Sequence, residues 1–172
     1  MTSGKEGLLV ANPKNGKVLS YNVIFKSPVE FLRKDGAFES TDGIRKYLLN
    51  RFFEWDESYK ELLEATSSFV LWPTRKISLN LQWKKERPLP ITLIGDAAHI
   101  MPPFAGQGAN IGLLDALILS NNLTNGEFET IEEAISDYEQ KMFVYATQAQ
   151  LETATNEIAM LSPGFSFLKF YR

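Results

Sequence analysis

The residues best suited to chemistry are gathered in a short stretch, positions 95–110. Asp96 follows an apolar run, and its ionised carboxylate could accept hydrogen bonds from hydroxyl groups of a ligand. Gly106 and Gly108 carry no side chain, so a ligand could approach the backbone closely there. A helix predicted from Asn110 onward would present unpaired N–H groups and a partial positive charge. This combination suits a phosphate, a carboxylate or an anionic ring edge.

The same residues allow simpler interpretations. The Gly-Gln-Gly sequence at 106–108, taken alone, favours an ordinary structural turn, because Gly112 comes one residue late for the dinucleotide fingerprint. His99 follows Asp96 by three residues, but one histidine and one carboxylate are too few ligands for a metal site. A hydrogen-bonded structural histidine is therefore expected. A hydrolase that uses Asp96 and His99 stays open as an alternative, although the sequence has no G-x-S-x-G motif.

Composition excludes several classes of protein. The chain has 172 residues, of which 44% are hydrophobic and 23% charged, as expected of an ordinary globular protein. A net charge of −3 without a dense basic run argues against nucleic-acid binding. The absence of cysteine and the single histidine exclude disulfides and the common zinc sites. No signal peptide and no apolar stretch of about 18 residues are found, so we expect no membrane association and a cytoplasmic location.

Local patterns predict the elements that must position these residues. Leu8–Ala11 and Val18–Phe25 flank a turn signal and predict a β-hairpin. Ile91–Ile94 is almost wholly apolar and predicts a strand buried on both faces. Lys84–Arg87 is expected to be a solvated charge run. Four helices are predicted: after a cap at Thr41-Asp42, after a cap at Asp56, from Asn110 to a stop at Asn125-Gly126, and from a capping box formed by Thr130 and Glu133.

A known family resembles this chain over the sequence Gly95-Asp96-Ala97-Ala98-His99 and the loop 102–110 that follows. These residues are similar to the second flavin-binding motif of class A flavoprotein monooxygenases, the aromatic-ring hydroxylases of the para-hydroxybenzoate hydroxylase fold. The resemblance covers nearly the whole chain. Within the family, it is greatest to the TetX-type tetracycline-inactivating monooxygenases, through Arg87–Thr92, Asp115–Ser120, Tyr138–Gln140 and Asn156-Glu157.

The resemblance implies a mixed α+β and α/β fold that corresponds to the C-terminal part of such an enzyme. Residues 1–86 would be part of the substrate-binding domain, with a partial sheet. Residues 87–126 would be the final flavin-binding strand, loop and helix, and residues 127–172 a C-terminal segment with a long helix. The family's glycine-rich βαβ unit for the pyrophosphate of flavin adenine dinucleotide (FAD) is not found in these residues, so the isolated chain is expected to be inactive. The complete enzyme is expected to be a monomer.

The resemblance also implies the chemistry. FAD would be the cofactor and NADPH its transient reductant, and a flavin hydroperoxide would transfer one atom of molecular oxygen to an aromatic or polycyclic substrate. Asp96 would bind a ribityl hydroxyl, and Pro103 would pack against the isoalloxazine ring. No side chain is expected to act as a catalyst or metal ligand. The implied FAD-binding residues are Gly95, Asp96, Pro103, Gly106, Gln107, Gly108 and Asn110, and the implied substrate-binding residues are Val10, Ser20, Pro103, Gly106 and Met160.

Two positions depart from the tetracycline-inactivating members. Ser20 stands where those enzymes place a substrate-facing histidine, and Val10 stands where they place an aromatic residue. We therefore expect weak hydroxylation of tetracycline, or a preference for another aromatic or polycyclic compound. The alternative from a different class is a non-catalytic binding or structural module that has the fold but no flavin.

Overall fold

A computed structural model describes residues 2–4, 7–14, 18–27, 40–79, 83 and 87–162. The chain divides into two compact units. Residues 1–73 and 158–172 form the first, and residues 74–157 form the second. The first unit contains a small sheet and two helices, whereas the second contains the glycine-rich segment and most of two long helices.

An antiparallel sheet opens the chain, with the order β1-β2-β3. Its strands are β1 (Thr2–Gly4), β2 (Gly7–Lys14) and β3 (Val18–Ile24). The β2–β3 register runs from the pair Leu8 and Ile24 to the pair Lys14 and Val18, which confirms the predicted hairpin. The sequence did not predict β1, because three residues are too few to show the alternation that marks a strand.

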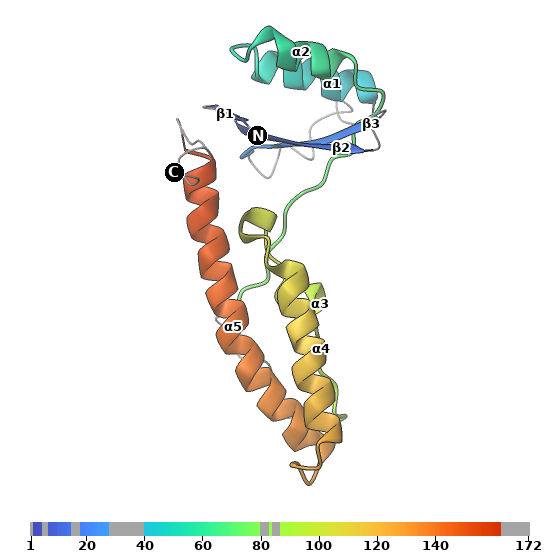
Figure 1. Ribbon diagram of the computed structural model, residues 1–172, viewed down its shortest axis with the longest axis vertical. Helices are drawn as coiled ribbons and strands as arrows, with labels where there is room; N and C mark the ends of the chain where they lie inside the picture. The colour runs from blue at the N-terminus through green and yellow to red at the C-terminus, as the bar shows by residue number, and fades with distance from the viewer. Residues whose placement is uncertain are drawn as a thin grey trace. The chain divides into compact units, whose positions relative to one another are not determined.

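Two helices cover one face of this sheet (Figure 1). The first, α1 (Thr41–Arg51), is capped by Ser40, whose side chain accepts a hydrogen bond of 3.1 Å from the backbone N–H of Gly43. The predicted cap at Thr41-Asp42 was therefore too late in the chain. The second, α2 (Glu57–Glu64), begins after Asp56, whose carboxylate accepts from the N–H of Ser58 at 3.0 Å, as predicted.

The core of the first unit lies between the sheet and these helices. Phe52 is buried and stacks on Trp55 with ring centroids 4.2 Å apart. Tyr21 and Val23 of β3 pack against the same core. Successive residues of a strand point to opposite faces, so positions 20 and 22 belong to the face of the sheet that is turned away from this core. The buried residues contributed by the helices and the segment between them are Ile44, Leu48, Phe52 and Leu63.

The second unit is built on two helices that run antiparallel (Figure 1). They are α4 (Gly108–Thr124) and α5 (Ile131–Met160), which belongs to this unit as far as Glu157. The capping box is confirmed: the N–H of Glu133 donates to Thr130 Oγ1 at 3.2 Å, and the N–H of Thr130 donates to Glu133 Oε2 at 3.3 Å. None of the helices in the described ranges has the length and apolar character needed to cross a bilayer. The buried core of this unit comprises Leu79, Ala98, Ile111, Tyr138, Met142, Ala146 and Ala149.

The strand predicted at Ile91–Ile94 is not formed within the described part of the chain. The side chains of Ile91 and Leu93 are 56% and 44% exposed, so the expected burial on both faces is wrong. The carbonyl of Ile91 accepts from Arg87 Nη1 at 2.6 Å, and the carbonyl of Leu93 accepts from the Tyr138 hydroxyl at 2.9 Å. Side chains therefore occupy the carbonyls that a neighbouring strand would use.

Gly7 provides a test of the packing in the first unit. A Cβ atom at this position would lie 2.7 Å from the carbonyl oxygen of Ile24 and 3.2 Å from the ring of Phe52. Gly7→Ala should therefore lower the free energy of unfolding by about 1–3 kcal/mol through overpacking. The measurement is urea unfolding. Gly108→Ala is the matched control, because a Cβ there would meet no described atom within 4 Å, and equal losses in the two variants would contradict this packing.

Candidate functional site

A glycine turn introduces Asp96. Gly95 has φ +60° and ψ −143°, a conformation that is strained for any residue with a side chain. It precedes the single-turn helix α3 (Asp96–His99), and the Asp96 side chain is exposed at the start of that turn. Gly112 of α4 lies close to the turn, because a Cβ at Gly112 would be 3.5 Å from the Gly95 Cα atom. The turn and α4 are thus in direct contact.

A buried carboxylate holds this turn. Asp115 of α4 is fully buried, and its Oδ2 atom accepts from the N–H of Gly95 at 2.7 Å. The same Oδ2 atom lies 2.7 Å from His99 Nε2, which confirms the prediction of a hydrogen-bonded structural histidine. The Tyr145 hydroxyl of α5 donates to Asp115 Oδ1. We call Gly95, His99, Asp115 and Tyr145 the Asp115 network.

The network affects the pKa of two phenols, the buried Tyr138 and the partly buried Tyr145. Burial raises the pKa of Tyr145, and its hydrogen bond to Asp115 and the negative charge of that residue raise it further. Burial also raises the pKa of Tyr138, with a smaller contribution from Asp115. Both hydroxyls therefore stay protonated at neutral pH. Tyr145 can then remain a hydrogen-bond donor to Asp115, and Tyr138 to the Leu93 carbonyl.

The glycine-rich loop leads from α3 to α4. Its central turn is η2 (Pro103–Ala105), in which Pro103 is exposed and Phe104 is buried. Asn156 of α5 donates to the Phe104 carbonyl at 3.2 Å and so holds this turn against α5. Gly106 has φ +65°, the left-handed conformation that glycine adopts readily, and it redirects the chain toward the start of α4.

The start of α4 is open to a ligand. A Cβ placed at Gly106 or Gly108 would meet no described atom within 4 Å. Gln107 stands at the N-cap but forms no side-chain capping bond, and the first turn of α4 carries no acidic residue. The helix therefore offers free N–H groups and a partial positive charge, while Asp96 offers a hydrogen-bond acceptor on the neighbouring turn. These residues fit a ligand that combines hydroxyl groups with an electron-rich edge.

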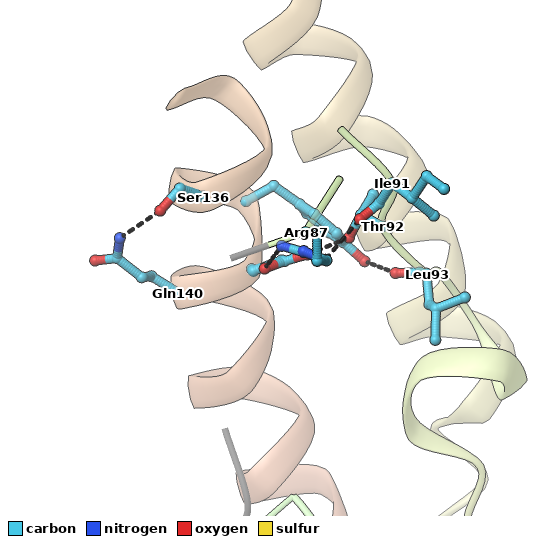
Figure 2. A network of polar contacts seen from close by, with 8 residues as sticks. Arg87, Ile91, Thr92, Leu93, Ser136 and Gln140 are labelled. Atoms are coloured by element: carbon cyan, nitrogen blue, oxygen red, sulfur yellow. Dashed lines mark hydrogen bonds and ion pairs between the residues drawn. The ribbon is translucent and has the colours of Figure 1, made fainter. Parts of the chain in front are cut away.

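A second polar network holds the segment that precedes Gly95 (Figure 2). Arg87 Nη1 and Nη2 donate to the two carboxylate oxygens of Glu139 at 2.8 and 2.7 Å, and Thr92 Oγ1 donates to Glu139 Oε1 at 2.7 Å. The expectation that Arg87 belongs to a solvated charge run was wrong, because Glu139 of α5 pairs with it across 52 positions of sequence. Residues 84–86 of that run lie outside the described residues. We call Arg87, Thr92 and Glu139 the Glu139 network.

The residues assigned to substrate are divided between the units. Pro103 and Gly106 lie in the second unit with all the assigned FAD residues, whereas Val10, Ser20 and Met160 belong to the first. In the hairpin register, Val10 pairs with Asn22 and Ser20 pairs with Asn12, which places positions 10 and 20 on the same face. Met160 is the last residue of α5. The structure thus places the FAD residues in one unit and Val10, Ser20 and Met160 in the other.

Sequence reasoning missed the two acidic residues on which these networks depend. Asp115 was not assigned a structural role, although it lies on the same helix face as Ile111 and Ile118, at spacings of four and three residues. A charged residue within an apolar helix face is a signal, because aspartate is rarely fully buried unless it is paired. Glu139 is also a charged residue beside a buried one, Tyr138, which is a signal of the same kind. No local pattern identifies Arg87 as the partner of Glu139.

The raised pKa of Tyr145 predicts a loss of stability at alkaline pH. The folded state keeps the phenol proton at pH values where the unfolded state, with a pKa near 10, loses it. This contribution to stability is complete below about pH 10 and falls as the pH rises further. Urea unfolding between pH 8 and 11 should show a steeper loss for the natural protein than for Tyr145→Phe. Equal slopes would contradict the buried bond to Asp115.

Several known proteins are similar to this chain in sequence. Hispidin-3-hydroxylase from Neonothopanus nambi is 34% identical over 94 residues, which are 54% of this chain and 22% of that protein. Salicylate hydroxylase from Pseudomonas putida is 30% identical over 117 residues, 65% of this chain and 26% of that protein. Kynurenine 3-monooxygenase from Salinispora tropica is 26% identical over 123 residues, 70% of this chain and 26% of that protein. The chain therefore spans about a quarter of the length of these relatives.

The matched family is described as an FAD binding domain, and the match covers residues 59–151. This range is more than half of the chain, and it contains α3, the glycine-rich loop, α4 and both polar networks. The open start of α4 and the exposed Asp96 both lie within the matched range. The chain belongs to the FAD binding domain family of flavoproteins.

Proposed function

We propose that the chain forms part of an FAD-dependent monooxygenase that hydroxylates an aromatic or polycyclic small molecule, with NADPH as reductant and molecular oxygen as co-substrate. One observation carries the proposal: the exposed Asp96 carboxylate and the open start of α4 lie in one unit, on elements that are joined by Asp115. The hydroxylases among the relatives support the reaction class. We further propose a soluble enzyme that acts as a monomer in the cytoplasm.

Most of the FAD residues have a specific task in this proposal. Asp96 would accept a hydrogen bond from a ribityl hydroxyl, and the exposed Pro103 would pack against the isoalloxazine ring. The backbone from Gly106 to Asn110 would face the ring edge that gains negative charge on reduction, where the positive end of α4 stabilises that charge. Bound FAD would supply the redox chemistry, taking a hydride from NADPH and activating oxygen. The protein's own residues would bind, orient and shield the reactants.

Substrate recognition is proposed for the face of the hairpin that carries positions 10 and 20. Ser20 is exposed on β3, and the opposite face packs on α1 and α2. We propose that Val10, Ser20 and Met160 of the first unit, and Pro103 and Gly106 of the loop, bind substrate. The small side chains at 10 and 20 favour an aromatic or polycyclic substrate other than the tetracyclines accepted by TetX-type enzymes.

The two alternatives are less well supported by these contacts. A hydrolase would need a histidine that can reach its substrate, but His99 is 1% exposed and its Nε2 atom is engaged by Asp115. A module that binds no flavin would not need an uncapped helix start next to glycines whose Cβ positions are open. Both observations favour the FAD site.

The role of Asp96 predicts a loss of FAD affinity. In the protein as its own gene encodes it, Asp96→Ala should raise the FAD dissociation constant about tenfold to a hundredfold, since a charge-assisted hydrogen bond is lost. Gly108→Ala should also weaken binding, because its Cβ fills the open space at the start of α4. Glu64→Ala, which removes an exposed carboxylate in the first unit, is the control. FAD titration with fluorescence detection measures each constant, and an Asp96→Ala protein with natural affinity would refute the role.

The small side chain at position 20 predicts a substrate preference. NADPH oxidation by the natural protein should be stimulated more by simple aromatic acids than by tetracycline, because Ser20 offers a shorter hydrogen-bonding group than histidine. Ser20→His should raise tetracycline turnover relative to the natural protein. Ser58→His should not, because Ser58 lies on α2, which packs on the opposite face of the sheet. Tetracycline turnover that is rapid in the natural protein would contradict this prediction.

A further inference from the structure

We infer that His99 and Asp115 are positioning residues that orient the Asp96 carboxylate toward FAD. This inference rests on the proposed function, because it assumes that Asp96 contacts the flavin. Neither residue was assigned to the cofactor from sequence, and both are buried, with exposed fractions of 1% and 0%. They act through α3, the single turn that begins with Asp96 and ends with His99.

The length of α3 makes it dependent on outside contacts. The helix has four residues, and its backbone bonds are those from Ala98 and His99 to the Gly95 carbonyl and from Ile100 to the Asp96 carbonyl. A single turn of helix is unstable by itself in water, because it fixes several dihedral angles for very few hydrogen bonds. Contacts with other elements must therefore hold α3 in place.

One atom supplies a contact at each end of the turn. Asp115 Oδ2 accepts from the Gly95 N–H, just before Asp96, and lies at the same distance, 2.7 Å, from His99 Nε2 at the end of α3. The two contacts bracket Asp96 along the chain. Movement of either end of α3 would break a hydrogen bond to a buried carboxylate, which is costly. The orientation of the turn is consequently fixed to α4.

Asp96 has no comparable support of its own. Its side chain is exposed and forms no hydrogen bond or ion pair with the described residues. The backbone of α3 therefore fixes the Cα–Cβ bond from which this carboxylate extends, and so the region that the carboxylate can reach. Since α4 also presents the open helix start, Asp115 fixes the position of Asp96 relative to the second part of the flavin site.

Tyr145 provides an internal control. Its hydroxyl donates to Asp115 Oδ1, the other oxygen, and comes from α5 rather than from α3. Tyr145→Phe and His99→Leu each remove one donor from the same buried carboxylate. Both variants should lose stability, but only His99→Leu releases an end of α3.

The experiment measures FAD affinity and Tm for these variants in the protein as its own gene encodes it. We expect His99→Leu to weaken FAD binding about tenfold, and His99→Gln, whose amide can still donate, to recover part of that loss. Tyr145→Phe should lower Tm and change the FAD dissociation constant far less than His99→Leu does, because it releases neither end of α3. The double variant Asp96→Ala/His99→Leu should bind FAD no more weakly than Asp96→Ala alone, because the two residues would act on one contact.

Three results would overturn the inference: natural FAD affinity in His99→Leu, equal losses of affinity in His99→Leu and Tyr145→Phe, or losses that multiply in the double variant. If His99→Leu does not fold, Asp115→Asn takes its place in the same comparisons, since one oxygen then becomes a donor. If neither variant folds, His99→Gln is used instead. The inference is then overturned if the losses of FAD affinity in His99→Gln and in Asp96→Ala multiply in the double variant. An Asp96→Ala protein with unchanged affinity would instead refute the proposed role of Asp96, so the two failures are distinguishable.

Discussion

The second unit depends on a carboxylate that is removed from water. A buried aspartate is strongly destabilising unless hydrogen-bond donors replace its hydration shell. Asp115 obtains those donors from the Gly95 turn, from the end of α3 and from α5. The fold must therefore keep three separate elements against one side chain of α4. The same requirement brings the exposed Asp96 close to the helix start that is open to a ligand.

Helix α5 supports the glycine-rich segment and its flanks at three positions along the length of the helix. Glu139 binds Arg87 and Thr92, Tyr145 binds Asp115, and Asn156 binds the carbonyl of Phe104. The supported segments carry little regular structure of their own, and extended or single-turn segments gain rigidity mainly from tertiary contacts. A long regular helix thus holds irregular segments in fixed positions, which a binding site built on loops requires.

Local interactions account for what the sequence predicted well. The hairpin, the Asp56 cap and the box of Thr130 and Glu133 all depend on residues that are neighbours in the chain. The strand at Ile91–Ile94 was wrong because strand pairing requires a partner strand, which no local pattern reveals. Arg87 was misassigned for a similar reason, since Glu139 is distant in sequence. The glycine positions and Asp96 were identified from their residue types and from the resemblance, whereas the support from Asp115 became evident only from the buried contacts.

The alternation along β3 has a consequence for how this protein can diverge. Tyr21 and Val23 pack into the core of the first unit, while Ser20 and Asn22, which alternate with them, are exposed. Substitutions at the exposed positions change no buried contact, and surface substitutions of this kind usually alter stability by less than about 0.5 kcal/mol. The side chains on that face can therefore change during evolution with little effect on the stability of the fold. On β3, the positions that can change during evolution are therefore different from the positions that stabilise the fold.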